Sequence, residues 1–249
     1  DNRGQLKYSI NSDGKITQNI NNAFGMVTET IAYDADIESI TPYVIDDFDV
    51  ISEIVNSNDF PKPGDVNFTA DHQKILNHYN TGISQTISDL LAQNISDSDR
   101  SSFAVYDDRN QVRYTIDPEG YVTENRYNAF GQVTDSIRYS ESISLVSGSE
   151  YSTGDIKIKL IEIFGEDANQ DINDLSKQVV TFLYDGKGQQ RFIIDQLGYV
   201  SENRFNSFGN VVSNIITTYR TESRQTDTCN SLQTYFAENG YDGSIKEYK

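Results

Sequence analysis

The residues best suited to nucleophilic or metal chemistry are few. The 249-residue chain has one cysteine, Cys229, and two histidines, His72 and His78. A catalytic triad needs a serine or cysteine beside a histidine base, and the nucleophile-elbow pattern GxSxG does not occur. The two histidines lie six residues apart on an expected helix, so we interpret them as solvent-facing positions. One cysteine and two histidines can scarcely form a zinc site, and no disulfide can form within the chain.

Carboxylates are abundant, with 38 Asp and Glu against 20 Lys and Arg. Two carboxylates could hydrolyse a glycosidic bond, but nothing in the sequence singles out one pair. Two acidic clusters could supply oxygen ligands to calcium: Asp34, Asp36 and Glu38, and Asp46, Asp47 and Asp49. Neither cluster has the spacing of an EF-hand or a nonapeptide repeat. We therefore expect solvated loop charge and no cofactor, with calcium binding as the alternative.

The net charge of −18 at neutral pH limits the partners of the chain. Nucleic acid is disfavoured, because a phosphate backbone is bound mainly through clustered Lys and Arg. An anionic membrane surface is disfavoured for the same reason. No window of eighteen apolar residues occurs, so we expect no membrane insertion.

An internal repeat organises the chain. Residues 107–139 match residues 1–33 at 16 of 33 positions, with an offset of 106. Residues 184–217 match residues 106–139 at 17 of 34 positions, with an offset of 78. Chance would give only a few matches over this length, so the chain contains three copies of one unit.

Turn-forming residues recur at the same places in the copies. Gly and Asn enter left-handed backbone geometry at least cost, and Asp at the start of a turn accepts hydrogen bonds from the amides that follow. The residues that we assign as structural turn formers are Asp1, Gly14, Gly25, Asp107, Gly120, Asn128, Gly131, Asp185, Gly198, Asn206 and Gly209. We expect the aromatic residue of each NxFG turn to plug the turn onto the sheet; these residues are Phe24, Phe130 and Phe208.

Between the turns lie short runs rich in Val, Ile, Tyr, Phe and Thr. In the run QVRYTI, Val112, Tyr114 and Ile116 share one face, which is the period-2 pattern of a half-buried strand. Each copy is therefore predicted to be an antiparallel meander of about three strands. The fold class is mainly β with inserted helices, in which meander repeats stack into an extended or spiralling sheet and the helices pack along it.

The boundaries follow from the repeat. Repeat units are predicted at 1–33, 106–139 and 184–219, with insertions at 34–105 and 140–183. Residues 220–249 are either a truncated insertion or the start of a further unit. The apolar spacing predicts a helix at about 70–93 in the first insertion, helices at 155–164 and 171–180 in the second, and one at 226–238 in the third. These helices either cover a sheet edge or act as lids and partner surfaces.

Two stretches suggest a family. The sequences YDDRNQVRYTID at 106–117 and YDGKGQQRFIID at 184–195 resemble the unit of RHS/YD-repeat proteins, whose usual form is YDxxGRL followed by an apolar strand. The resemblance implies a segment of a large bacterial secreted or surface protein, in which the repeats form a spiralling β-sheet shell. In toxin members that shell encloses an effector.

The chain departs from the family pattern in two ways. The family runs its units nearly back to back, whereas this chain inserts long segments, which leaves a filament open beside a closed shell. Gln5, Gln111 and Gln189 replace the usual arginine, so no role of that arginine carries over. Toxin members cleave themselves at an Asp-Pro-containing motif, but we interpret Asp117-Pro118 as a repeat turn, in which Pro favours the required φ.

The sequence thus predicts a non-enzymatic structural segment that builds a shell or filament of an extracellular or cell-surface protein. Its expected partners are neighbouring repeat segments of the same polypeptide, with self-assembly also open. Two alternatives remain: an adhesion or glycan-recognition module, in which exposed aromatic rings stack on sugars, and the shell of a toxin whose effector lies outside this chain.

Overall fold

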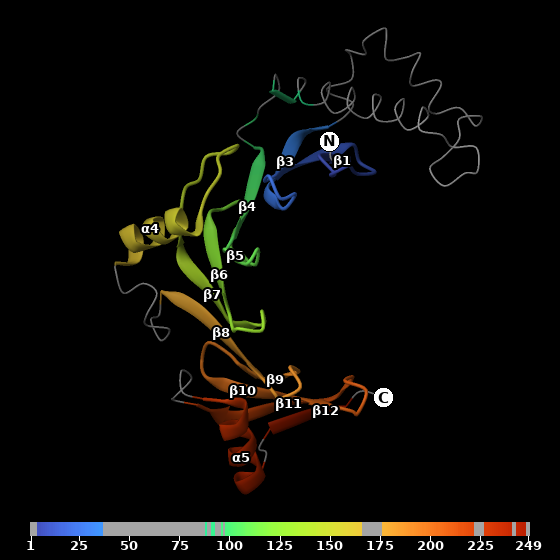
Figure 1. Cartoon of the computed structure of the whole chain (residues 1–249), viewed down its shortest axis with the longest axis vertical. Helices are drawn as coiled ribbons and strands as arrows, with labels where there is room; N and C mark the ends of the chain where they lie inside the picture. The colour runs from blue at the N-terminus through green and yellow to red at the C-terminus, as the bar shows by residue number, and fades with distance from the viewer. Residues whose placement is uncertain are drawn as a thin grey trace, which may run out of the picture. The chain divides into compact units, whose positions relative to one another are not determined.

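The computed structural model describes residues 4–36, 88, 91–92, 96, 98–165, 176–221, 227–240 and 243–247. The chain divides into two compact units. Figure 1 shows their strands and helices. The first contains β1 (Tyr8–Ile10), β2 (Lys15–Asn21), β3 (Val27–Asp36) and the start of β4 (Arg100–Tyr106). In it, β1 pairs with β2, β2 with β3, and β3 with residues 100–103 of β4, all antiparallel.

The second unit continues from the end of β4. Its strands are β5 (Val112–Ile116), β6 (Tyr121–Tyr127), β7 (Val133–Ser142), β8 (Lys177–Tyr184), β9 (Gln190–Ile194), β10 (Tyr199–Phe205), β11 (Val211–Arg220) and β12 (Gly243–Glu247). Two helices belong to this unit, α4 (Thr153–Phe164) and α5 (Cys229–Asn239).

The order of hydrogen-bonded strands follows the chain from β1 to β12, with β4 common to both units. The pairings of β5 with β6, β6 with β7, β7 with β8 and β8 with β9 are antiparallel. Short turns join the first, second and fourth of these pairs, and a short turn permits only antiparallel pairing. The order ends at β1 and at β12, so the described strands form an open sheet and not a barrel. This confirms the mainly β, antiparallel meander with inserted helices that the sequence predicts.

The strand pairs β2–β3, β6–β7 and β10–β11 of the three copies have register shifts at equivalent residues. In the pairing of β2 with β3, register shifts occur after Lys15 and after Ile20. The β6–β7 pairing shifts after Tyr121 and Arg126, and the β10–β11 pairing shifts after Tyr199 and Arg204, at the equivalent positions. Because each irregularity bends a strand locally, identical shifts give the copies the same local shape.

Each later copy has one strand more than the sequence indicates. β4 and β8 precede the first turn of their copies and complete four strands, β4–β7 and β8–β11. The helix predicted at 171–180 is therefore wrong from Lys177 onward, where β8 begins. The spacing of Val179, Val180 and Leu183 fits a helix, but the pairing of β8 with β7 and β9 makes this segment a strand.

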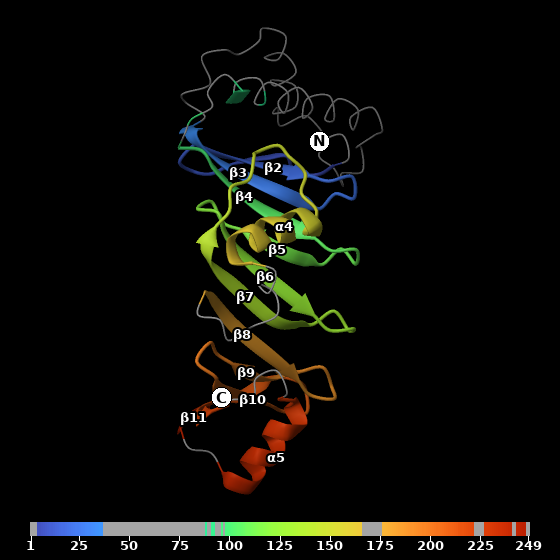
Figure 2. The same cartoon turned by 90° about the vertical axis from the view of Figure 1, so that its left-hand side faces the viewer.

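The two helices cover the same face of equivalent strands. On α4, Ile156 and Leu160 are fully buried, and Phe164 contacts Tyr139 of β7. On α5, three residues pack against three of the sheet: Cys229, Leu232 and Phe236 against Phe192, Ile194 and Val200. Figure 2 shows α4 in front of β5 and β6, and α5 beside β10 and β11. Burying each large side chain contributes about 1.5–3 kcal/mol, so these helices supply much of the apolar core.

Both helices begin at a capping box. The hydroxyl of Ser152 accepts a hydrogen bond from the amide of Asp155, and Thr228 does the same for Ser231. α4 begins two residues before the helix predicted at 155–164 and ends at the same residue. α5 begins three residues after the start of the helix predicted at 226–238 and ends one residue beyond it. Most of the helix predicted at 70–93 lies outside the described residues. None of the helices in the described part of the chain has the length and apolar content to cross a membrane.

Candidate functional site

The turns place side chains along the edges of the sheet in one recurring geometry. The carboxylate Oδ1 of Asp107 accepts hydrogen bonds from the amides of Arg109 and Gln111, both at 2.9 Å. Asp185 binds the amides of Lys187 and Gln189 in the same way. Since Oδ1 of each carboxylate accepts hydrogen bonds from two backbone amides, these residues hold the turn.

The NxFG turns use asparagine for the same purpose. The Oδ1 atoms of Asn128 and Asn206 each accept from the amides two and four residues later. The assigned glycines that close the turns all have positive φ: Gly14, Gly25, Gly120, Gly131, Gly198 and Gly209. Asp1 lies outside the described residues.

The aromatic residues of these turns are not where the sequence places them. The exposed fractions of Phe24, Phe130 and Phe208 are 81%, 89% and 87%. The prediction that they plug the turn onto the sheet is therefore wrong. The amides of Phe24, Phe130 and Phe208 bind the preceding Asn side chain, so the backbone alone fixes the turn and the ring extends into solvent.

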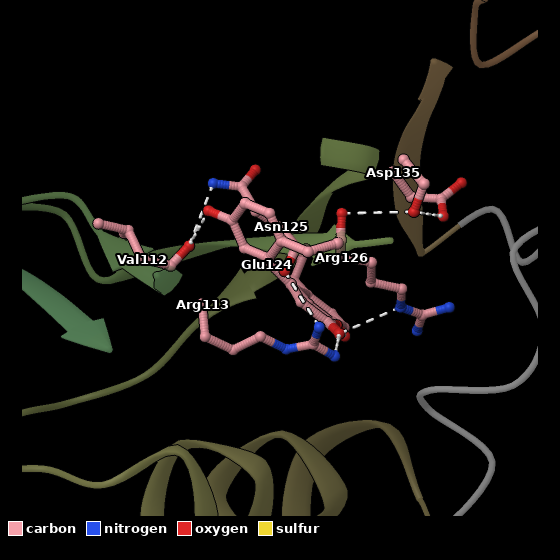
Figure 3. A network of polar contacts seen from close by, with 9 residues as sticks. Val112, Arg113, Glu124, Asn125, Arg126 and Asp135 are labelled. Carbon is pink, nitrogen blue, oxygen red and sulfur yellow. Dashed lines mark hydrogen bonds and ion pairs between the residues drawn. The ribbon is translucent and has the colours of Figure 1, made fainter. Parts of the chain in front are cut away.

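A buried charge network lies on the face covered by α4 (Figure 3). Glu124 of β6 is 1% exposed, and its Oε1 accepts hydrogen bonds from Arg113 at 2.5 Å and from Arg126 at 3.1 Å. Its Oε2 accepts from the phenol of Tyr139 at 2.7 Å. Arg113 also donates to the carbonyl of Asn125 at 3.1 Å. A buried carboxylate is tolerated when several charged and polar donors replace its water, as they do here.

The third copy repeats this network. Glu202 is fully buried, and its carboxylate accepts from Arg191 at 2.5 Å and from Arg204 at 3.1 Å. Thr217 stands where Tyr139 does and donates instead to the carbonyl of Val200 at 2.7 Å. The two arginines and the glutamate are therefore common to the networks of the second and third copies.

The first copy has a neutral version. Gln18 replaces the glutamate, and the phenol of Tyr33 donates to its Oε1 at 2.6 Å. Burial, and then the proximity of Tyr8, Asp99 and Glu29, raises the pKa of Tyr33 to about 12. Tyr33 thus remains a neutral donor, and the first copy has no buried charge at this position.

Glutamate reappears elsewhere in the first unit. Glu29 of β3 is buried, and its Oε2 accepts a hydrogen bond from the amide of Gly148 at 2.8 Å. This bond links the segment 146–150 to β3 within that unit.

The network favours a structural role over proton transfer. Both oxygens of Glu124 already accept hydrogen bonds, Oε1 from Arg113 and Arg126 and Oε2 from Tyr139. Burial first, and then the Glu124 carboxylate, raise the pKa of Tyr114 and of Tyr139, so both phenols stay protonated at neutral pH. A general acid or base needs a proton that it can exchange near neutral pH, and neither of these phenols has one.

The residues considered for nucleophilic or metal chemistry do not converge in the described structure. Burial is the main cause that raises the pKa of the Cys229 thiol, which disfavours a reactive thiolate. His72, His78, Glu38, Asp46, Asp47 and Asp49 lie outside the described residues, and the side chain of Asp36 is not described. Within the part of the chain that the structure describes, no three His, Cys, Asp or Glu side chains gather as a metal site would require.

Sequence reasoning missed the charge network, although a signal was present. Arg113, Glu124 and Arg126 recur as Arg191, Glu202 and Arg204 at identical spacing. Polar residues in a strand are expected to face solvent, so the recurrence of these charged residues does not by itself predict that the glutamate is buried.

No profile of a known protein family matches the chain, and no curated protein sequence matches it. Similar solved structures include a Tc holotoxin pore of Photorhabdus luminescens, with a TM-score of 0.38 and 11% identity over 82% of this chain. Another is the crystal structure of TcdB2-TccC3-Cdc42, with a TM-score of 0.39 and 12% identity over 82% of this chain. This chain spans 6% of the length of each of those solved chains. We therefore infer its function from its own residues.

Proposed function

We propose that this chain is a non-enzymatic structural segment whose repeats tile an antiparallel sheet in the framework of a larger extracellular protein. The framework would be a shell or a filament, and the immediate partners would be neighbouring repeat segments. The observation that supports this proposal best is the shared register of the copies. All three bend at equivalent positions, so each presents the same strand edges to its neighbours.

The buried side chains also support a structural role. The charged cluster of the second and third copies joins two adjacent strands, β5 to β6 and β9 to β10. A network with all of its donors and acceptors paired rigidifies a sheet and fixes its register. Binding sites, in contrast, keep polar groups directed at a cavity.

The experiment that tests the proposal is electron microscopy of the intact protein that contains this segment, combined with a panel of hydrolase substrates. We expect the segment to lie in a continuous wall or fibre and to turn over none of the substrates. Turnover that Glu124→Gln or Glu202→Gln abolishes without unfolding the chain would overturn the structural proposal. A closed capsule around a separate domain would instead favour the toxin-shell alternative that the sequence resemblance implies.

Exposed tyrosines favour a second candidate, an adhesion or glycan-recognition module. Tyr121 and Tyr199 stand at equivalent positions at the start of β6 and β10, and they are 36% and 42% exposed. Aromatic faces of this kind can stack on sugar rings. A glycan array distinguishes the candidates: saturable binding that Tyr121→Ala and Tyr199→Ala remove supports recognition, and a blank array supports the structural role.

A further inference from the structure

The turns form with residues of very different type at their third position. In eight turns the amide of the fourth residue donates to the carbonyl of the first: 11–14, 22–25, 107–110, 117–120, 128–131, 185–188, 195–198 and 206–209. Their third residues are Asp13, Phe24, Arg109, Glu119, Phe130, Lys187, Leu197 and Phe208. Since acidic, basic and apolar residues all fit, folding does not require phenylalanine at this position. It is nevertheless present in all three NxFG turns.

The NxFG tips are also uncharged. The segments 21–27, 127–133 and 205–211 contain no Asp, Glu, Lys or Arg, in a chain whose net charge is −18. Each displays one ring that is more than four-fifths exposed. An exposed aromatic ring on an uncharged tip gains free energy when a partner removes it from water.

In the second unit these tips lie at the same end of the strands. We call this row of turns an edge of the sheet. Because successive strands reverse direction, the turns β4–β5, β6–β7, β8–β9 and β10–β11 lie at the same edge (Figure 2). The turns β5–β6 and β9–β10 lie at the opposite edge. Phe130 and Phe208 are separated by four strands, or about 19 Å at the usual strand spacing.

Charged tips alternate with the phenylalanine tips along this edge. The β4–β5 turn has Asp107, Asp108 and Arg109, and the β8–β9 turn has Asp185 and Lys187. Each charged tip thus carries both signs. Two such edges related by a twofold axis can set ring against ring and Asp against Arg or Lys, which makes the edge self-complementary.

We propose that this edge, defined by Phe130, Phe208, Arg109 and Lys187, is a contact surface for a second copy of the chain. The inference rests on the proposed structural function and names the surface through which segments associate. A buried phenylalanine covers about 150–250 Å², so a few rings and the charged tips form a small, concentration-dependent interface. Overall repulsion between two acidic chains opposes the contact, so association strengthens when moderate salt screens that repulsion.

Sedimentation velocity tests the proposal with a matched control. We expect the average mass of the wild-type chain to rise with concentration, and more steeply in moderate than in low salt. The variant Phe130→Ser/Phe208→Ser is expected to associate at least about tenfold more weakly, as loss of the central apolar contacts predicts. Leu197→Ser, an exposed apolar residue in the same turn position at the opposite edge, should associate as the wild type does.

A gain-of-contact variant guards against effects of misfolding. Phe130→Cys should form disulfide-linked dimers on mild oxidation, whereas Leu197→Cys should not, and the native Cys229 is buried in both. A wild-type chain that stays monomeric at every concentration would overturn the proposal. Equal cross-linking of the two cysteine variants would do the same.

Lipid is the competing ligand for exposed rings. If the monomeric chain sediments with phosphatidylcholine vesicles and the double serine variant does not, the edge binds lipid and the proposed contact is wrong. Failure of self-association leaves the structural proposal standing, because that proposal is tested separately by imaging the intact protein and by substrate turnover.

Discussion

Glu124 illustrates how a single charged residue can be part of a core. Its carboxylate is surrounded by Arg113, Arg126 and Tyr139, each within hydrogen-bonding distance. Removal of the charge alone, with the shape kept, leaves two guanidinium groups beside a neutral amide. The energetic cost therefore falls on the partners as much as on the residue that is changed.

Glu124→Gln is expected to lower the free energy of unfolding by about 2–4 kcal/mol, the range for breaking a buried ion pair whose arginines keep some contact with water. Urea unfolding followed by circular dichroism measures this loss. Glu141→Gln, at an exposed position of β7, serves as the control and should change stability by no more than about 0.5 kcal/mol. Equal effects of the two substitutions would contradict the assigned role of the network.

Asp117 provides a pH-dependent test. Burial, the largest single influence, raises its pKa, but hydrogen bonds from Arg138 and from the amides of Tyr121 and Glu119 together outweigh burial, so the pKa lies below its ordinary value. A carboxyl group whose folded pKa is depressed stabilises the fold above the unfolded pKa of about 3.9. That stability is lost as the pH falls through the folded pKa.

We expect Asp117→Asn to keep the turn, since Asn11 holds the equivalent turn of the first copy. The variant loses the exposed ion pair with Arg138, which contributes up to about 1 kcal/mol. Urea midpoints of variant and wild type should therefore differ at neutral pH and converge in acid. Asp107→Asn is the control, because Oδ1 of Asp107 holds its turn through the amides of Arg109 and Gln111; a difference that persists in acid would contradict the ion-pair explanation.

At the scale of elements, the turn after β5 is coupled to the strand end of β7. The carbonyl of Gly120 accepts from the amide of Ile143, and the carbonyl of Gly198 accepts from Thr221 in the third copy. A Cβ at Gly120 would collide with the carbonyl oxygen of Ile143. Glycine is therefore needed here both for its φ of +87° and for space.

Gly120→Ala is accordingly expected to cost more than Gly148→Ala. Both substitutions strain a positive φ, at about 1–2 kcal/mol each, but nothing lies within 4 Å of a Cβ at Gly148. The steric conflict at Gly120 should add about 1–3 kcal/mol, as overpacking usually does. Urea unfolding gives the difference, and faster hydrogen exchange at Ile143 would locate it. Similar losses in both variants would show that the close approach does not matter.

The predictability of these elements varied with the kind of signal. Turns were evident because Asp, Asn and Gly recur wherever the chain reverses, as at Asn128 and Gly131. β8 was missed in part because its apolar spacing fits a helix, and only its neighbours β7 and β9 decide the matter. The burial of Glu124 and the exposure of Phe130 depend on tertiary structure. Glutamate is usually exposed and phenylalanine usually buried, and the residues next to them in the sequence do not indicate otherwise.

At the scale of the whole molecule, repetition and charge act in opposite directions. In a repeat protein each repeat contacts its neighbours, so every added copy contributes hydrogen bonds and buried apolar area. The excess of acidic residues is distributed over the same chain and repels itself in the folded state. Stability should therefore depend on the ionic atmosphere more than on any single ion.

Added salt tests this dependence and the calcium alternative together. Raising NaCl from low to physiological concentration should raise Tm by about 2–4 °C, the shift that about 1 kcal/mol produces in a chain of this size. CaCl2 and MgCl2 at matched ionic strength should have equal effects, because screening does not distinguish them. Differential scanning calorimetry provides the comparison. Extra stabilisation by calcium that saturates with concentration would show a specific site, since only binding to the folded state raises stability by mass action.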